Sequence, residues 1–95
     1  MTIKYIDLVL ESVPDGPGLV PLDNDTFLSA ASGEAALRAA GAGIAAVDAV
    51  AQGQVHNCFC AVRPPGHHAE IATAMGFCLF NNAAIAALHA RVAHG

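Results

Sequence analysis

The sequence predicts part of an α/β domain, in which short strands of an open parallel sheet are flanked by helices. Three segments carry apolar residues at helical spacing, and breaks rich in glycine and proline separate two of them. Residues 58–62 (CFCAV) are apolar throughout and Pro64 follows them, a pattern typical of a parallel strand buried on both faces. Such a strand needs neighbouring strands and helical layers. We therefore expect residues 1–95 to form one domain with an incomplete sheet.

Residues 5–13 (YIDLVLESV) are the first expected helix. Ile6, Val9, Leu10 and Val13 recur at i, i+3, i+4 and i+7, which places them on one face. The segment PDGPG at 14–18 ends this helix, since proline cannot donate to the helical hydrogen-bond ladder. Residues 19–29 (LVPLDNDTFLS) are expected to be extended and irregular, because an Asp-Asn-Asp run favours local turns.

The second expected helix follows Ser32, which is a candidate N-cap, and Gly53 is expected to end it. Its predicted buried face consists of Leu37, Ala40, Ile44, Val47 and Ala51. Gly41 and Gly43 each weaken the helix by about 1 kcal/mol relative to alanine. They either permit close approach of another element or reflect composition alone.

The third helix is expected after a second short apolar run at residues 76–80 (GFCLF). Asn81 or Asn82 is the predicted N-cap, and Ile85, Leu88 and Val92 share one face. Arg91 and His94 fall near the C-terminal end of this helix, where cations interact favourably with the helix dipole.

Composition excludes several classes of function. Eight acidic residues stand against four basic ones, so neither a nucleic-acid groove nor a site for an anionic membrane is expected. The sequence has no apolar run of membrane-spanning length and no pattern of a signal peptide. Three cysteines do not make a disulfide framework, so reduced thiols and a cytoplasmic location are expected.

The adjacent histidines His67 and His68 are the candidate catalytic residues. They lie in the loop after the expected strand at 58–62, and ligands of open parallel sheets bind at the carboxyl ends of strands. Histidine also exchanges protons near neutral pH. A polar surface loop is the alternative, and a two-histidine metal site is disfavoured because adjacent rings rarely face one ion. His56, His89 and His94 are interpreted as structural or solvent-exposed.

The motif RPPGHHAE at 63–70, followed by GFCLFNNAAIAA at 76–87, resembles the histone deacetylase superfamily of zinc-dependent, arginase-like deacetylases. The nearest branch comprises bacterial deacetylase-like amidohydrolases, class II deacetylases and acetylpolyamine amidohydrolases. The resemblance implies that His67 and His68 are the tandem histidines that move protons around a zinc-activated water. It implies that Gly76 and Phe77 line the tunnel for the acyl-lysine chain, and that Cys78 is buried nearby.

Other residues of the family pattern are missing from this sequence. It contains no Asp-x-His zinc-binding pair, no tyrosine after the tandem histidines, and no matching carboxylates to orient them. Relative to the family, the chain is therefore expected to be truncated at both ends, to bind no zinc by itself and to be inactive alone. The implied substrates are acetyl-lysine or acetylpolyamines, and no nucleic acid or membrane is expected as a partner.

Two alternatives belong to other classes of function. One is a truncated, non-catalytic paralogue that self-associates or binds a partner through unpaired strand edges. The other is a small metal protein that uses Cys58, Cys60 and the histidines.

Overall fold

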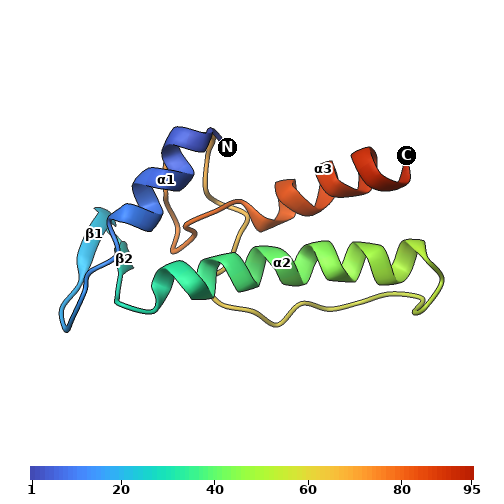
Figure 1. The fold of residues 1–95 in the computed structure, drawn as a ribbon, viewed down its shortest axis with the longest axis horizontal. Coiled ribbons are helices and arrows are strands. Elements are labelled where there is room, and N and C mark those ends of the chain that lie inside the picture. Colours follow the sequence, from blue (N-terminus) through green and yellow to red (C-terminus); the bar gives the residue numbers. More distant parts are fainter.

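The computed structural model describes residues 1–95 and contains three helices and one hairpin (Figure 1). In chain order the elements are α1 (Ile3–Glu11), β1 (Val20–Asp23), β2 (Thr26–Leu28), α2 (Ser32–Ala51) and α3 (Asn82–His94). Helices α2 and α3 pack side by side and run in the same direction, because the connection between them returns along α2. The molecule measures 43 × 23 × 20 Å. None of its helices is both long and apolar enough to cross a bilayer.

Helix α1 confirms the first predicted helix and its apolar face. Val9 is fully buried, and Ile6, Leu10 and Val13 pack partly buried around the same core. The hydroxyl of Thr2 accepts a hydrogen bond from the backbone N–H of Tyr5 at 3.2 Å and caps the helix. The apolar spacing therefore identified the element and the side of it that is buried.

The segment at 19–29, expected to be extended, forms an antiparallel hairpin of β1 and β2. Asp23 Oδ1 accepts a hydrogen bond from the backbone N–H of Asp25 at 3.1 Å, which is the kind of local turn expected here. Thr26 and Leu28 are buried, and Phe27 between them is exposed, as the period of two in a strand requires. This hairpin is the whole sheet of the molecule.

Helix α2 lies where the second helix was predicted, but its start differs. Ser32 is the first residue of the helix and not its N-cap, because its hydroxyl accepts a hydrogen bond from the backbone N–H of Ser29 at 2.8 Å. Gly53 has φ +75° directly after the C-cap, which confirms it as the terminating residue.

The predicted buried face of α2 is only partly right. Ala40 is buried, but Leu37 is half-exposed, and the other buried positions are Gly33, Ala36 and Ala39. Leu10 of α1 and Val13 just beyond its end explain the difference, because they lie so close to Gly33 that a Cβ there would be 3.1 Å from the Val13 side chain. Small residues allow this approach, and a prediction that favours bulky residues misses it.

The two glycines in the middle of α2 have different surroundings. A Cβ at Gly43 would lie 3.4 Å from the Cβ of Ala86 in α3, so this glycine does sit at a close approach between elements. A Cβ at Gly41 would meet no other segment. Of the two readings of these glycines, close approach therefore holds for Gly43 alone.

The predicted parallel strand at 58–62 is wrong. These residues form no strand, and Phe59 in their centre is 89% exposed. No other strand within the 95 residues lies beside them, and a strand cannot exist without a hydrogen-bonded partner. Within residues 1–95 the antiparallel hairpin is the one sheet, and no parallel strand pair is present.

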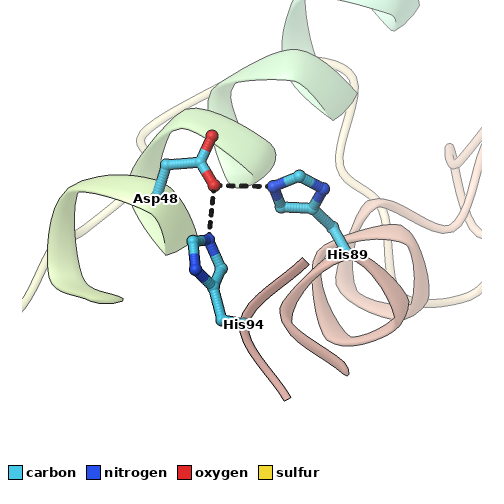
Figure 2. A group of neighbouring side chains, drawn as sticks. All are labelled: Asp48, His89 and His94. Carbon is cyan, nitrogen blue, oxygen red and sulfur yellow. Dashed lines mark hydrogen bonds and ion pairs between the residues drawn. The ribbon is translucent and has the colours of Figure 1, made fainter. Parts of the chain in front are cut away.

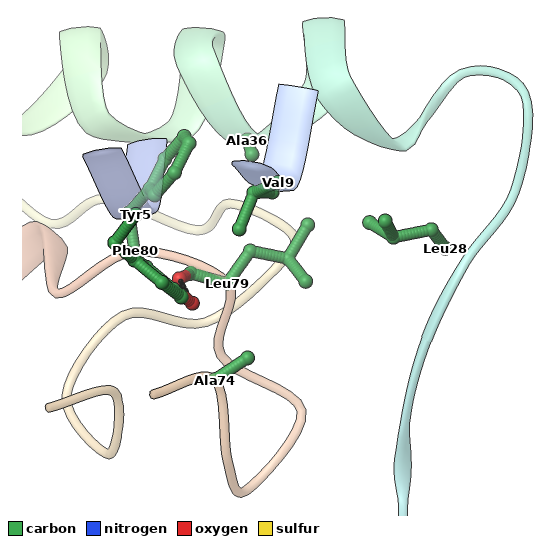
Figure 3. Close-up of a cluster of buried hydrophobic side chains, with 7 residues drawn as sticks. All are labelled: Tyr5, Val9, Leu28, Ala36, Ala74, Leu79 and Phe80. Atoms are coloured by element: carbon green, nitrogen blue, oxygen red, sulfur yellow. Dashed lines mark hydrogen bonds between the residues drawn. The ribbon is translucent and has the colours of Figure 1, made fainter. Parts of the chain in front are cut away.

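The apolar run at 76–80 is likewise not a strand, yet three of its residues are among the most buried in the molecule. Cys78, Leu79 and Phe80 are at most 3% exposed, and Leu79 and Phe80 belong to the core cluster. Figure 3 shows this cluster, in which side chains from α1, β2, α2 and the loop before α3 meet.

Tyr5 joins the two ends of this core. Its hydroxyl donates a hydrogen bond to the carbonyl oxygen of Leu79 at 2.5 Å, and its ring meets that of Phe80 edge-on at a centroid distance of 6.5 Å. Burial raises the pKa of the Tyr5 phenol above its usual value. The contact fixes the loop before α3 to the first helix.

Helix α3 begins as predicted, with Asn81 as its cap. The side-chain oxygen of Asn81 accepts a hydrogen bond from the backbone N–H of Ala84 at 2.9 Å. The helix itself contains no buried residue: Ile85 packs against the core, while Leu88 and Val92 of its predicted face are exposed.

We predict that Tyr5→Phe lowers the free energy of unfolding by about 1–3 kcal/mol, because the buried Leu79 carbonyl loses its donor. Since the phenol has a raised pKa in the folded state, wild-type stability should also fall as pH rises past about 10. Tyr5→Phe should lack this alkaline loss. Urea denaturation at pH 7 and at several alkaline pH values measures both effects.

Ser12→Ala is the matched control, since the Ser12 hydroxyl donates to the Leu8 carbonyl at an exposed position of the same helix. Its effect should be close to zero. Equal effects of the two substitutions would contradict the role given to Tyr5.

Candidate functional site

The backbone of the tandem histidines is held by a buried thiol. The N–H groups of His67 and His68 both donate to Cys78 Sγ, each at 3.4 Å, and Cys78 is completely buried. The two imidazole rings lie 4.2 Å apart between centroids and are tilted by 49°. Both residues are exposed. The thiol therefore fixes the backbone of both histidines from the buried side, while their side chains remain exposed to solvent.

A tight turn places Gly76 and Phe77 beside the histidines. Met75 and Cys78 exchange backbone hydrogen bonds of 2.9 and 3.2 Å, and the two residues between them have φ of +58° and +65°. Positive φ at both central positions is typical of a type I′ turn. A Cβ on Gly76 would lie only 2.7 Å from the His68 ring, so glycine is needed there for space as well as for conformation.

Phe77 adopts a conformation that is rare for a residue with a side chain. Its backbone N–H donates to Oγ1 of the buried Thr26 at 3.1 Å, which connects the turn to β2. The residue as a whole is 63% exposed. Backbone strain of this kind is concentrated at functional sites. The structure thus brings His67, His68, Gly76 and Phe77 into one group.

The start of α3 supports the other side of the histidine loop. The Asn81 side chain donates to the carbonyl of Ala69 at 2.9 Å, and the carbonyl of Gly66 accepts from the backbone N–H of Ala83 at 2.9 Å. A side chain at Gly66 would overlap that of Asn82. Gly66 therefore permits the close contact between this loop and α3.

The surroundings of the histidine rings do not fit a zinc ion. Neither imidazole is hydrogen bonded to a carboxylate, and His67 and His68 belong to no group of three metal-ligating side chains. A catalytic zinc requires three protein ligands and an open position. No reaction step through zinc is therefore assigned to this group.

An open groove of about 730 Å³ runs past Phe77. Its walls come from the hairpin, the start of α2 and the segment before the histidines, and include Asp25, Thr26, Arg63, Pro64 and Pro65. The groove does not include the histidines. It offers an apolar wall at Phe77 and charged groups at the rim.

A second polar group lies between α2 and α3 (Figure 2). Oδ1 of Asp48 is 2.7 Å from Nε2 of His89 and 2.7 Å from Nε2 of His94. These hydrogen bonds, that of His94 first, lower the pKa of the Asp48 carboxyl. The interpretation of His89 and His94 as structural or solvent-exposed did not foresee their common partner. It lies 41 and 46 residues away in the sequence, and no local pattern reports such a contact.

The chain matches the model of the histone deacetylase domain over residues 2–95. It belongs to the histone deacetylase family. Human polyamine deacetylase HDAC10 is 61% identical over 57 residues, which are 60% of this chain and 8% of that protein. Histone deacetylase 5 of Arabidopsis thaliana is 53% identical over 64 residues, which are 67% of this chain and 10% of that protein.

A solved structure agrees with the architecture. The crystal structure of the HDA15 HD domain superposes with a TM-score of 0.89 at 41% identity, covering 98% of this chain and 26% of that chain. The fold seen here is therefore that of the corresponding part of a histone deacetylase domain. The chain spans about a quarter of that domain structure and a tenth or less of the two relatives.

We predict that Gly76→Ala destabilises the protein by about 2 kcal/mol or more, because it adds left-handed strain and an overlap with the His68 ring. The ring resonances of His68 should shift in NMR spectra, and those of His56 should not. Gly41→Ala is the matched control and should stabilise α2 by about 1 kcal/mol. An unchanged His68 signal in the Gly76 variant would contradict the arrangement.

Proposed function

We propose that this chain carries the proton-transferring part of a deacetylase active site, with His67 and His68 as general base and general acid. One observation supports the proposal above all: in a member of this family, a buried thiol holds two adjacent histidines with both rings free. Residues 1–95 are then part of a single deacetylase-like domain.

The proposed reaction is amide hydrolysis. One imidazole takes a proton from water as the water oxygen bonds to the acetyl carbon, and the carbon–nitrogen bond then breaks. The other imidazole gives a proton to the departing amine, so that acetate and a free amine result. Rings 4.2 Å apart can serve the two sides of one amide group. Neither ring is hydrogen bonded to another side chain, so the geometry gives neither ring the role of base.

The proposed substrate is an acetylated amine on a flexible methylene chain, either acetyl-lysine or an acetylpolyamine. Phe77 presents an exposed flat apolar face, and such a face suits a methylene stem. Phe77 directly follows Gly76, which lies against the His68 ring. The human relative HDAC10 carries the name polyamine deacetylase, and the plant relative is a histone deacetylase, so both substrate classes occur among the similar proteins.

Zinc, when bound, would polarise the acetyl carbonyl and activate water. The residues around His67 and His68 do not supply its ligands, so we expect no turnover from these 95 residues alone. A chimeric protein provides the test. This chain replaces the matching part of the HDA15 domain, and hydrolysis of acetyl-lysine peptide and acetylpolyamine is measured.

In the chimera we expect activity, and a loss of about 10²–10⁴-fold in kcat for His67→Ala and for His68→Ala. His56→Ala, an exposed histidine outside this group, is the control and should keep full activity. The proposal fails if the chimera is active and both variants at positions 67 and 68 remain equally active.

A further inference from the structure

The group of Asp48, His89 and His94 has no part in the proposed deacetylase site. Along α3, His89 and His94 lie about 10 and 18 Å beyond Asn82, the residue that contacts the tandem-histidine loop. Asp48 lies in α2 and the two histidines lie in α3, and these helices run side by side in the same direction (Figure 1). The close contact at Gly43 and Ala86 brings the helices together just before this point.

The donor atoms of this group converge. The Nε2 atoms of His89 and His94 each lie 2.7 Å from the same oxygen of Asp48. All three potential ligand atoms lie within 4.8 Å of one another. The two rings meet edge-on at 84°, so their nitrogen atoms approach the carboxylate from different directions, as Figure 2 shows. Around a tetrahedral zinc, ligand atoms are about 3.3 Å apart, given metal–ligand distances of about 2.0–2.1 Å. To reach this spacing, the carboxylate oxygen would have to withdraw from each nitrogen by about 0.6 Å, and the two nitrogens would have to approach each other by up to about 1.5 Å.

We propose that Asp48, His89 and His94 bind one divalent transition-metal ion of the zinc class, which fastens the end of α3 to α2. Two imidazoles and one carboxylate are a donor set for zinc, cobalt(II) or nickel(II), whereas magnesium and calcium prefer oxygen ligands throughout. The side chains of Asp48, His89 and His94 are 38%, 27% and 26% exposed. Solvent can therefore supply the remaining ligand, and the side chains can adjust.

The packing of α3 indicates what a bound metal ion would stabilise. The helix buries none of its own residues, and Leu88 and Val92 on its outer half are exposed. Ile85, near the beginning of α3, packs against the apolar core. No residue in the later turns of α3 belongs to that core. A metal ion that joins α2 and α3 would stabilise the end by mass action, in proportion to its affinity for the folded chain.

The direct test is zinc titration of the metal-free 95-residue chain by calorimetry, in a Cys58→Ser, Cys60→Ser background. That background removes competing thiols, because Cys58 and Cys60 are free and exposed, and Cys58 lines the same open pocket as Val47 and Ala90. We expect one zinc ion per chain and a raised melting temperature. Zinc should also shift the NMR signals of His89 and His94.

Single variants Asp48→Asn, His89→Gln and His94→Gln should each weaken zinc binding by at least about 10-fold, since even indirect partners of a metal contribute that much. Circular dichroism without metal establishes that each variant keeps its helices. His56→Gln is the control and should bind zinc as the parent does. The proposal is overturned if no zinc binds, if the three variants bind as the parent does, or if His67→Gln or His68→Gln abolishes binding instead.

Discussion

The arrangement of the candidate site depends on the buried thiol of Cys78. This one sulfur atom accepts the backbone N–H groups of both His67 and His68, so the loop cannot turn its histidines without losing two hydrogen bonds. Burial places the thiol where no water competes for these bonds. Its neighbour Leu79 accepts the hydroxyl of Tyr5, which connects the same short segment to the first helix. The core and the site therefore share one peptide segment.

Much of the helical structure could be predicted from the sequence, because the residues that form and end a helix lie close together in the sequence. The apolar spacing of α1, the cap at Asn81 and the terminator at Gly53 are each determined by residues a few positions apart. The strand predicted at 58–62 fails for the opposite reason. Its apolar composition fits a buried strand, but a strand is defined by its partner, and none lies beside it in these 95 residues.

The two sites differ in the same way: one is encoded by a short sequence motif, and the other by residues that are far apart in the sequence. The tandem histidines and the Gly76–Phe77 turn could be found from a motif, and the structure places them together. The meeting of Asp48 with His89 and His94 could not, because it depends on how α2 and α3 pack along Gly43. Family membership explains the first group. The second group lies between the later turns of α2 and α3, and no residue of α3 is buried.

The histidine loop is built on the buried Cys78. This arrangement can be tested by alkylation of the native chain followed by mass spectrometry of each cysteine, since Cys58 and Cys60 are exposed internal references. We expect Cys58 and Cys60 to react readily and Cys78 to be protected until denaturant is added. A Cys78 that reacts as fast as the other two in the native chain would contradict it.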